Sequence, residues 1–214
     1  MTSTKPKLLD LFCCQGGAGM GYHLAGFDVV GVDIAPQPRY PFEFHQADAL
    51  EYLSEHGREF DAIHASPPCQ AHTLAQRLMG NEHPDLIAPT RGLLEAIGLP
   101  YIIENVPGSP LHNPGELCGA MFGLGTYRHR LFESNVSLEF PVHLPHTART
   151  TKMGRAPKDG EMMHVVGNFS GVAKAKEAMG IDWMNRDGLR ESIPPAYTRF
   201  LGGQLMAARV GVAA

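Results

Sequence analysis

The first 33 residues constrain the fold most, because an apolar run, a glycine-rich loop, a helical segment and a second apolar run follow one another there. Residues 7–12 predict a short buried strand, and the loop at 13–21 contains four glycines before a short helix that ends near Gly26. This order opens the nucleotide-binding unit of doubly wound α/β folds, in which glycines let the backbone approach a ligand and the helix start offers N–H groups. A tight turn between strand and helix has the same pattern, and no G-x-G-x-x-G motif occurs, so the loop alone leaves both interpretations open.

The second apolar run, residues 28–33, predicts another strand that ends in Asp33, 23 residues after Asp10. An acid at the tip of the second strand is the usual partner of ribose hydroxyls in this kind of fold. The alternative for Asp33 is a solvated carboxylate or a helix cap, but the spacing favours the ligand role. Asp48 precedes a predicted helix through Leu53, where it can cap the helix or contact a base amino group.

Composition indicates one α/β domain with at most a small appendage, because the chain has 214 residues of which 43% are hydrophobic. Its 24 glycines and 17 prolines indicate many turns and close backbone approaches. The formal net charge is −4, so any surface that binds nucleic acid must be local.

The four cysteines, Cys13, Cys14, Cys69 and Cys118, form no C-x-x-C pair, and we expect reduced thiols in a cytosol. No Cys/His pair repeats at zinc-finger spacing among the 11 histidines, so we expect no metal and interpret Cys118 as an inert core residue. The first residues show no apolar stretch behind a basic start, and no apolar run approaches the ~20 residues that span a membrane. We therefore expect a cytoplasmic protein without membrane contact.

A candidate nucleophile follows the apolar run at 60–65, which predicts a buried strand before Ser66-Pro67-Pro68-Cys69-Gln70. The prolines stop the strand, because they lack an N–H and fix their own backbone angles. Cys69 is then held on a stiff loop at the carboxyl end of a strand, where α/β sheets bind ligands. A lone cysteine is more often a small buried hydrophobe, so Cys69 needs support from the rest of the chain.

A candidate acid follows the next predicted strand, at Glu104-Asn105-Val106-Pro107 after the apolar residues 101–103. Desolvation should raise the pKa of such a carboxyl, which lets it carry a proton near neutral pH as an acid catalyst must. The alternative is a surface ion pair. Residues 71–83 predict a polar loop beside the site, and residues 86–97 predict a helix.

Two basic stretches occur later in the chain. Residues 127–132 alternate like a strand, which would place Arg128 and Arg130 on one face, where guanidinium groups suit phosphate or a base carbonyl. Residues 142–158 contain no acid and predict a flexible basic segment, the one local surface for a polyanion. A solvated edge and a solvated loop are the alternatives for these two stretches. A last helix is predicted from 193 to 205.

Taken together, these stretches resemble the motifs of the DNA cytosine C5-methyltransferase family, in the family's order, from residue 8 to about residue 205. Each motif is short, but the ordered set is specific. The matching stretches are Asp10-Leu11-Phe12 with the glycine loop, Asp33, Asp48, Pro67-Pro68-Cys69-Gln70, Glu104-Asn105-Val106, Arg128-His129-Arg130 and Ile193-Pro194-Pro195-Ala196.

The resemblance implies the Rossmann-like α/β fold of S-adenosylmethionine-dependent methyltransferases, with a mostly parallel central sheet and a small target-recognition insert. It implies that Cys69 attacks C6 of a cytosine flipped out of double-stranded DNA, that Glu104 holds or protonates N3, and that S-adenosylmethionine donates a methyl group to C5. The implied catalytic residues are Cys69, Glu104, Arg128 and Arg130; the cofactor-binding residues are Asp10, Phe12, Gly16, Gly17, Asp33, Asp48 and Pro67; the substrate-binding residues are Gln70, Asn105, Arg149, Lys152 and Arg155.

It also implies a catalytic, cofactor-binding part over residues 1–135, a short basic insert over 136–180 and a C-terminal helix over 181–214 that returns to the catalytic part. The insert is small for target recognition, which makes a homodimer one expectation. The compact size suggests an enzyme of a phage, a mobile element or a restriction–modification system.

Two departures from the family's pattern leave other interpretations open. Cys14 stands where the family usually has glycine, and Glu191-Ser192 replaces the usual Gly-Asn before the last motif. The alternatives are an RNA cytosine methyltransferase with the same chemistry, a non-catalytic DNA-binding decoy, and a nicotinamide-dependent dehydrogenase. The dehydrogenase gives Cys69 and Glu104 no role, and a decoy has no need of Cys69, Glu104 and Arg130 together.

Overall fold

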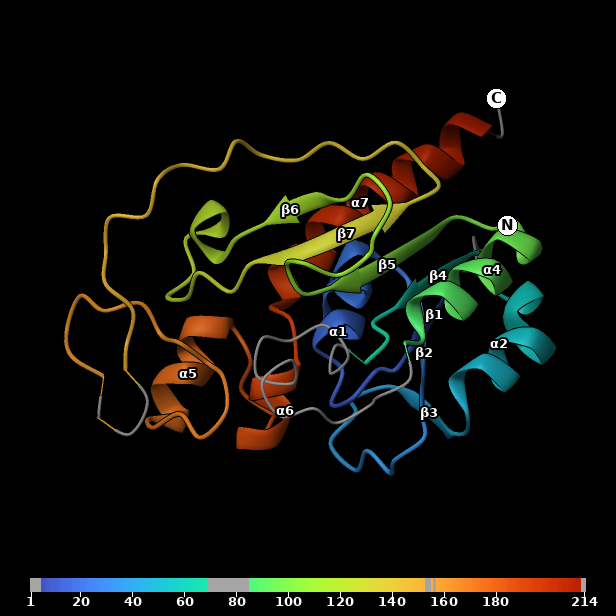
Figure 1. The fold of residues 1–214 in the computed structure, drawn as a ribbon. Coiled ribbons are helices and arrows are strands. Elements are labelled where there is room, and N and C mark those ends of the chain that lie inside the picture. Colours follow the sequence, from blue (N-terminus) through green and yellow to red (C-terminus); the bar gives the residue numbers. More distant parts are fainter. Residues whose placement is uncertain (1–4, 69–84, 153–154, 156, 213–214) are drawn as a thin grey trace.

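The structure is a computed structural model that describes residues 5–68, 85–152, 155 and 157–212, and its centre is a seven-stranded sheet (Figure 1). The strand order is β3-β2-β1-β4-β5-β7-β6. The parallel strands are β1 (Lys7–Leu11), β2 (Asp28–Asp33), β3 (Glu43–Gln46), β4 (Ala62–Ala65) and β5 (Tyr101–Asn105). At one edge, β7 (Arg130–Ser134) runs antiparallel to β5, and β6 (Gly115–Leu117) runs antiparallel to β7. The expected mostly parallel α/β sheet is confirmed.

Side chains alternate along each buried strand, so both faces of the sheet carry apolar residues that must be covered. Helices cover both faces (Figure 1). Leu8 faces the layer made by α1 (Gly17–Ala25) and α7 (Pro195–Val212), whereas Leu9 and Leu11 face α2 (Ala49–His56) and α4 (Ile87–Ile97). Glycines let α1 and α7 approach closely, and the Thr198 hydroxyl donates to the Ala18 carbonyl at 2.8 Å. Two 3-10 turns, η1 (Gly57–Glu59) and η3 (Gly119–Phe122), complete this part.

A smaller unit lies beside the sheet and contains α5 (Val172–Met179) and α6 (Arg186–Glu191). It has its own hydrophobic cluster, which runs from Met163 to Leu189. Residues on both sides of position 180 therefore share one core, across the expected end of the insert. An extended segment without helix or strand, residues 135–149, connects β7 to this unit (Figure 1).

The strand expected at 127–132 differs in the structure, because β7 begins only at Arg130. Arg128 has a φ of 29° and therefore does not continue an extended backbone. The Tyr197 hydroxyl holds this bend by donating to the Arg128 carbonyl at 2.8 Å. Arg128 and Arg130 consequently do not share a strand face. Among the described residues, no helix is long and apolar enough to cross a membrane.

Candidate active site

The carboxyl ends of the parallel strands surround a cavity of about 380 Å³, which is the place where open α/β sheets bind ligands. Because β7 runs antiparallel to β5, its first residue, Arg130, lies at the same edge as Glu104 and Asn105. The expected site residues that line this cavity are Asp10, Phe12, Gly17, Asp33, Asp48, Pro67, Glu104, Asn105 and Arg130. Cys69 and Gln70 lie outside the described residues, directly after the lining residue Pro68.

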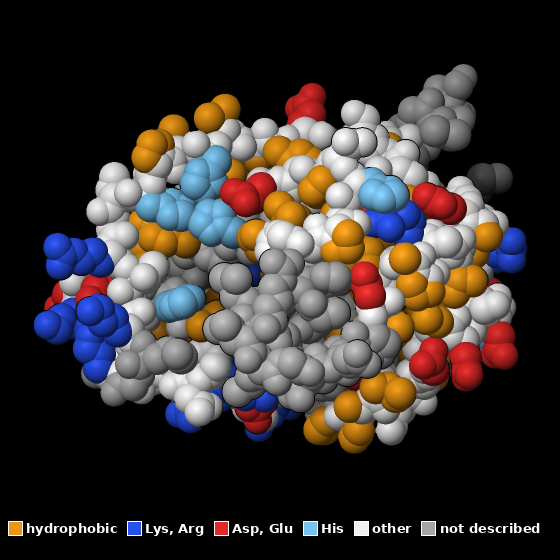
Figure 2. All heavy atoms as spheres, viewed as in Figure 1, with side chains coloured by type: hydrophobic (Ala, Val, Ile, Leu, Met, Phe, Trp, Pro, Cys, Tyr) orange, Lys and Arg blue, Asp and Glu red, His pale blue; other side chains and the backbone are white. Residues whose placement is uncertain are grey.

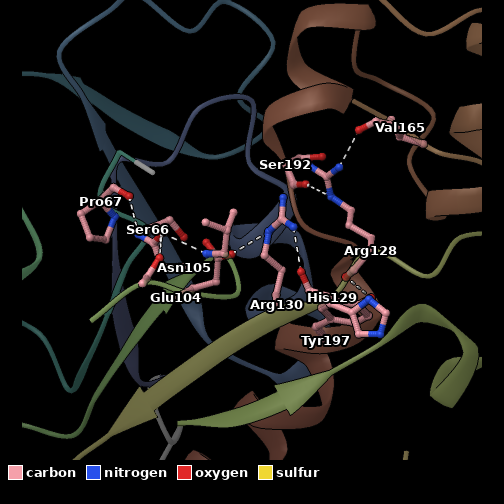
Figure 3. Close-up of polar contacts among 12 residues, drawn as sticks. Ser66, Pro67, Glu104, Asn105, Arg128, His129, Arg130, Val165, Ser192 and Tyr197 are labelled. Atoms are coloured by element: carbon pink, nitrogen blue, oxygen red, sulfur yellow. Dashed lines mark hydrogen bonds and ion pairs between the residues drawn. The ribbon is translucent and has the colours of Figure 1, made fainter. Parts of the chain in front are cut away.

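Glu104 is buried at the end of β5 and forms an ion pair with Arg130, whose Nε lies 2.9 Å from Oε1 (Figure 3). This contact lacks hydrogen-bond geometry, so Oε1 has no hydrogen-bond partner among the described residues. Burial raises the pKa of Glu104, and Arg130 and a hydrogen bond from Ser66 oppose that rise. The ion pair is therefore buried, not on the surface, and the carboxyl has the environment that an acid catalyst requires.

A buried chain of hydrogen bonds supports Glu104 from below the cavity. The Tyr22 hydroxyl lies 2.9 Å from Nδ1 of His64, and Nε2 of His64 lies 2.9 Å from the Ser66 hydroxyl, which contacts Glu104. Burial lowers the pKa of His64 to about 3, so the imidazole is neutral and has one N–H. Because Ser66 donates to Glu104, that N–H belongs on Nε2, and Tyr22 donates to Nδ1. The chain thus fixes the direction of the hydroxyl that points at Glu104.

Asn105 connects the two loops that carry the nucleophile and acid motifs. Its Nδ2 donates to the Pro67 carbonyl at 2.9 Å, and its Oδ1 accepts from Val106 N at 2.9 Å and from the Ser109 hydroxyl at 2.7 Å (Figure 3). We expected this side chain to contact substrate. In the structure its amide holds the Pro67 loop against the end of β5, and the substrate contact stays a prediction.

Three carboxylates line the opposite side of the cavity. Asp33 accepts N–H groups from Cys14 at 2.9 Å and Ala35 at 3.0 Å. Asp48 caps α2 through Oδ1, and no described residue donates to its Oδ2, so the cap and the ligand roles are compatible. Asp10 is buried, and its Oδ2 accepts from the Tyr40 hydroxyl at 3.1 Å.

The carboxylate oxygens in this cavity suit S-adenosylmethionine. Oδ1 of Asp10 is buried without a hydrogen-bond partner among the described residues, and burial raises the pKa of Asp10 to about 8. A cationic amine or sulfonium close to Asp10 would favour its ionised form and satisfy that oxygen. The free oxygen of Asp48 suits a hydroxyl or amino group, and the apolar side chains of Phe12, Ile34 and Leu86 line part of the wall.

The glycine loop makes this wall compact. A Cβ on Gly17 would lie 2.5 Å from the Ile193 carbonyl oxygen, so only glycine fits there. Gly16 has a φ of 82° and precedes α1 without lining the cavity. Cys14 lines the cavity with a φ of 45°, a left-handed backbone that favours glycine, which explains why glycine is usual at this position. Burial raises the pKa of the Cys14 thiol, so it stays protonated.

Arg128 does not line the cavity, and its guanidinium points toward Ser192 and Val165 (Figure 3). Its guanidinium donates to the carbonyl oxygens of Ser192 at 2.6 Å, Val165 at 2.6 Å and Arg190 at 2.8 Å. We expected Arg128 to contact phosphate or a base carbonyl. In the structure Arg128 holds the end of α6, the start of the linker to α7 and Val165 of the smaller unit, because the backbone bends before β7 starts, and the substrate contact stays a prediction.

The basic segment surrounds a second, more open hollow of about 750 Å³. Arg149, Lys152, Arg155 and Lys158 line it, together with Tyr127 and Glu161. Arg155 pairs with Glu161, whereas Arg149 and Lys152 are exposed. Figure 2 shows Lys and Arg side chains gathered at the left edge of the molecule, where Figure 1 places the loop before α5.

Four lining residues, Arg190 to Ile193, were not expected in the site. Arg190 and Glu191 end α6, and Ser192 and Ile193 begin the linker to α7, which closes the cavity over Gly17. The sequence signal was present, because the last family motif begins at Ile193 and the departure at Glu191-Ser192 lies directly before it. Ser66 also gave no sequence signal, since its role depends on the buried His64 beneath it.

Known proteins resemble this chain in sequence and in fold. A type II methyltransferase, M.AquIA of Picosynechococcus sp., is 29% identical over 121 residues, which are 48% of this chain and 49% of that protein. The chain thus matches about half the length of this curated relative. No protein-family model matches the chain.

Two solved structures share the fold over nearly the whole chain. A prophage-encoded protein of E. coli that is described as a DNA modification methyltransferase has a TM-score of 0.65 at 15% identity and covers 94% of this chain and 99% of its own. The Dnmt2 methyltransferase of S. pombe has a TM-score of 0.63 at 12% identity and covers 96% and 99%. The expected Rossmann-like methyltransferase fold is confirmed. The sequence match is to a type II methyltransferase and the shared fold is that of methyltransferases, and both agree with the resemblance that the ordered motifs indicated.

Proposed function

We propose that the protein is a DNA cytosine C5-methyltransferase with S-adenosylmethionine as its cofactor. The observation that carries the proposal is one cavity in which the buried pair Glu104–Arg130 and the Pro67–Pro68 loop face the carboxylates of Asp10 and Asp48. The acid motif, the arginine motif and the loop that precedes Cys69 thus meet the cofactor motifs at the carboxyl ends of the parallel strands. The similarity to a type II methyltransferase supports the same conclusion.

The reaction divides into steps that suit these residues. The thiolate of Cys69 attacks C6 of cytosine, which makes C5 nucleophilic. When bound, S-adenosylmethionine supplies an electrophilic methyl group for C5. Loss of the C5 proton then breaks the bond between Cys69 and C6 and restores the aromatic ring. The base that removes the proton is not assigned to a residue.

Glu104 acts at N3 of the cytosine. Burial raises the pKa of Glu104 above its ordinary value, which favours a protonated carboxyl that can share its proton with N3. The ion pair with Arg130 and the hydrogen bond from Ser66 fix the carboxyl in one orientation. Attack at C6 shifts electron density to N3, and the Glu104 carboxyl stabilises it there.

The distribution of charge supports DNA as the partner. Arg149, Lys152 and Lys158 line the open hollow beside the extended segment, in a protein whose net charge is −4. Such a local basic surface suits the phosphates of double-stranded DNA. The cytosine would leave the stack to reach the cavity, at a cost of about a few kcal/mol that phosphate contacts offset.

Nucleoside mass spectrometry tests the proposal. The full chain is incubated with S-adenosylmethionine and unmethylated duplex DNA, and we expect 5-methylcytosine. Cys69→Ser should abolish the product while calorimetry still detects cofactor binding. Arg58→Met, at an exposed arginine in η1, is the matched control and should keep full turnover.

Duplex DNA that carries 5-fluorocytosine separates the covalent mechanism from other routes. This base has no C5 proton to lose, so the bond to Cys69 should survive denaturation. Product on RNA and none on duplex DNA would assign the enzyme to RNA. Cofactor binding without product or adduct on either nucleic acid would refute catalysis and favour the decoy.

A further inference from the structure

Four metal-ligating side chains meet outside the candidate active site. One ligand atom from each of Cys118, His129, His143 and His146 lies within 4.8 Å of the corresponding atom of the others. None of the four lines the cofactor cavity. Figure 2 shows the largest group of histidine side chains on the visible face at the upper left, where Figure 1 places β6 and η3.

The four residues come from three separate parts of the chain. Cys118 is buried at the N-cap of η3, directly after β6, and His129 directly precedes β7. His143 and His146 are exposed on the extended segment 135–149, which crosses above these strands (Figure 1). The sheet edge therefore supplies two rigid ligands, and the segment supplies two ligands that can adjust.

The distances approach those of a tetrahedral metal site. Zn–N and Zn–S bonds of about 2.05 and 2.3 Å require edges of about 3.3 Å between two nitrogens and about 3.6 Å between nitrogen and sulfur. Nε2 of His129 lies 3.0 Å from Nε2 of His143, and Sγ of Cys118 lies 3.3 Å from Nε2 of His146. Small rotations of the exposed imidazoles bring the other pairs, now up to 4.8 Å apart, to the same separation.

A neighbouring aromatic ring positions one of the ligands. The rings of Tyr127 and His146 stack at a centroid distance of 3.5 Å and an angle of 7°. The Tyr127 hydroxyl also bonds to the backbone N–H and carbonyl of Ala148, at 3.0 and 2.9 Å. His146 is thus held with Nε2 toward Cys118, although its side chain is exposed. This support from outside the ligand set is typical of built metal sites.

We propose that Cys118, His129, His143 and His146 bind a zinc ion in a closed, tetrahedral site. A thiolate with three imidazoles is a ligand set that suits zinc, and four protein ligands leave no open position for catalysis. The metal therefore has a structural role. It fastens the extended segment to the β6–β7 edge of the sheet domain.

The part of the segment that carries His143 and His146 needs such a fastener. The side chains of Val136, Leu138 and Phe140 pack against the sheet core, whereas Val142 and Leu144 are 82% and 72% exposed, so hydrophobic packing does not anchor residues 142–144. Tyr127 and His146 also line the basic hollow, so the metal would fix one wall of the surface that we assign to DNA. The metal site does not depend on that assignment.

Metal analysis tests the proposal without reference to methyl transfer. The full chain is purified without a polyhistidine tag from zinc-supplemented cells. Inductively coupled plasma mass spectrometry should then find one zinc per chain. The double variant His143→Ala/His146→Ala should lose the metal, with zinc affinity reduced by about 100-fold or more. His164→Ala changes an exposed histidine of the same insert outside the cluster and should keep one zinc.

Cobalt replacement identifies the ligands. The Co²⁺ protein should show the visible bands of tetrahedral cobalt and a near-ultraviolet thiolate-to-cobalt band, and Cys118→Ser should lose only the latter. Removal of zinc should increase the rate of proteolysis within residues 135–149 and leave the sheet domain intact. Equal zinc content and affinity in the wild type and the double variant, with both folded by circular dichroism, would overturn the proposal.

Discussion

Replacement of Arg128 by methionine gives the sharpest test of the two arginines in the R-x-R motif. Methionine keeps much of the length and apolar character of the side chain but removes all five N–H donors. The carbonyl oxygens of Ser192, Val165 and Arg190 then lose their shared donor, at present 2.6–2.8 Å away. Two of these three contacts are buried, so water cannot simply replace the guanidinium.

The expected loss of stability follows from those contacts. A hydrogen bond to a charged group contributes about 1.5–3 kcal/mol. The three bonds share one guanidinium, and the Arg190 carbonyl is only partly buried, so their effects do not add fully. We expect Arg128→Met to lower the free energy of unfolding by about 3–5 kcal/mol.

Urea denaturation measures this change through Trp183, the only tryptophan in the chain. Its indole N–H donates to the Gln15 carbonyl at 2.8 Å, so its fluorescence reports on the junction that Arg128 holds. With a slope of about 2 kcal/mol per molar, the midpoint should fall by about 1.5–2.5 M.

Arg58→Met is the matched control for this experiment, because Arg58 is exposed and makes one long bond, 3.3 Å to the Ala96 carbonyl. Its unfolding free energy should stay within about 0.5 kcal/mol of the wild type. We call the three hydrogen bonds from Arg128 to the Ser192, Val165 and Arg190 carbonyl oxygens the clamp. If Arg128→Met unfolds like the wild type and yet loses methyl transfer, the stabilising role of the clamp is refuted and the substrate contact that the motif suggested is supported.

Three further perturbations address the cavity. Gly17→Ala should abolish cofactor binding by calorimetry, because the new Cβ would lie 2.5 Å from the Ile193 carbonyl oxygen; unchanged affinity would contradict the close contact. Ser66→Ala should raise the pKa of Glu104 further, since a hydrogen bond that favours the carboxylate is lost, and the pH above which turnover falls should move upward. The pKa of Asp10 is about 8 in the folded state and about 3.8 in the unfolded state. Between these values the folded state binds the extra proton, so the free energy of unfolding should decline as pH rises. Asp10→Asn should remove that decline in urea denaturation, and an unchanged slope would argue against the raised pKa.

The sequence predicted the sheet and its edge correctly because strong local signals determine them. Apolar runs of strand length, each stopped by an acid, a proline pair or a glycine loop, specify parallel strands whose carboxyl ends carry polar side chains. Asp10, Asp33, Pro67 and Glu104 could be placed together on this basis alone. Local patterns also located α2 and α4 with their ends close to the observed bounds.

The features that sequence reasoning missed depend on contacts between distant residues. The alternation around Arg128 suggested a strand, but carbonyl groups 37 to 64 residues away take up its guanidinium and the backbone bends. The histidine cluster has the spacing C-x10-H-x13-H-x2-H, which resembles no finger pattern because the extended segment, not a hairpin, brings His143 and His146 into place. Tertiary structure decides both outcomes.

The hydrogen bonds of Arg128 also connect it to the cofactor cavity. The carbonyl groups of Arg190 and Ser192 that Arg128 holds lie in the last turn of α6 and at the start of the linker that closes the cavity over Gly17. A ligand that contacts this linker can bind only when the linker is in place, so the free energy of the clamp is coupled to binding. Arg128→Met should therefore weaken cofactor binding although Arg128 does not line the cavity, and saturating cofactor should recover part of the lost stability. The two arginines of the motif then serve one site in different ways: Arg130 acts on Glu104 directly, and Arg128 keeps the opposite wall closed.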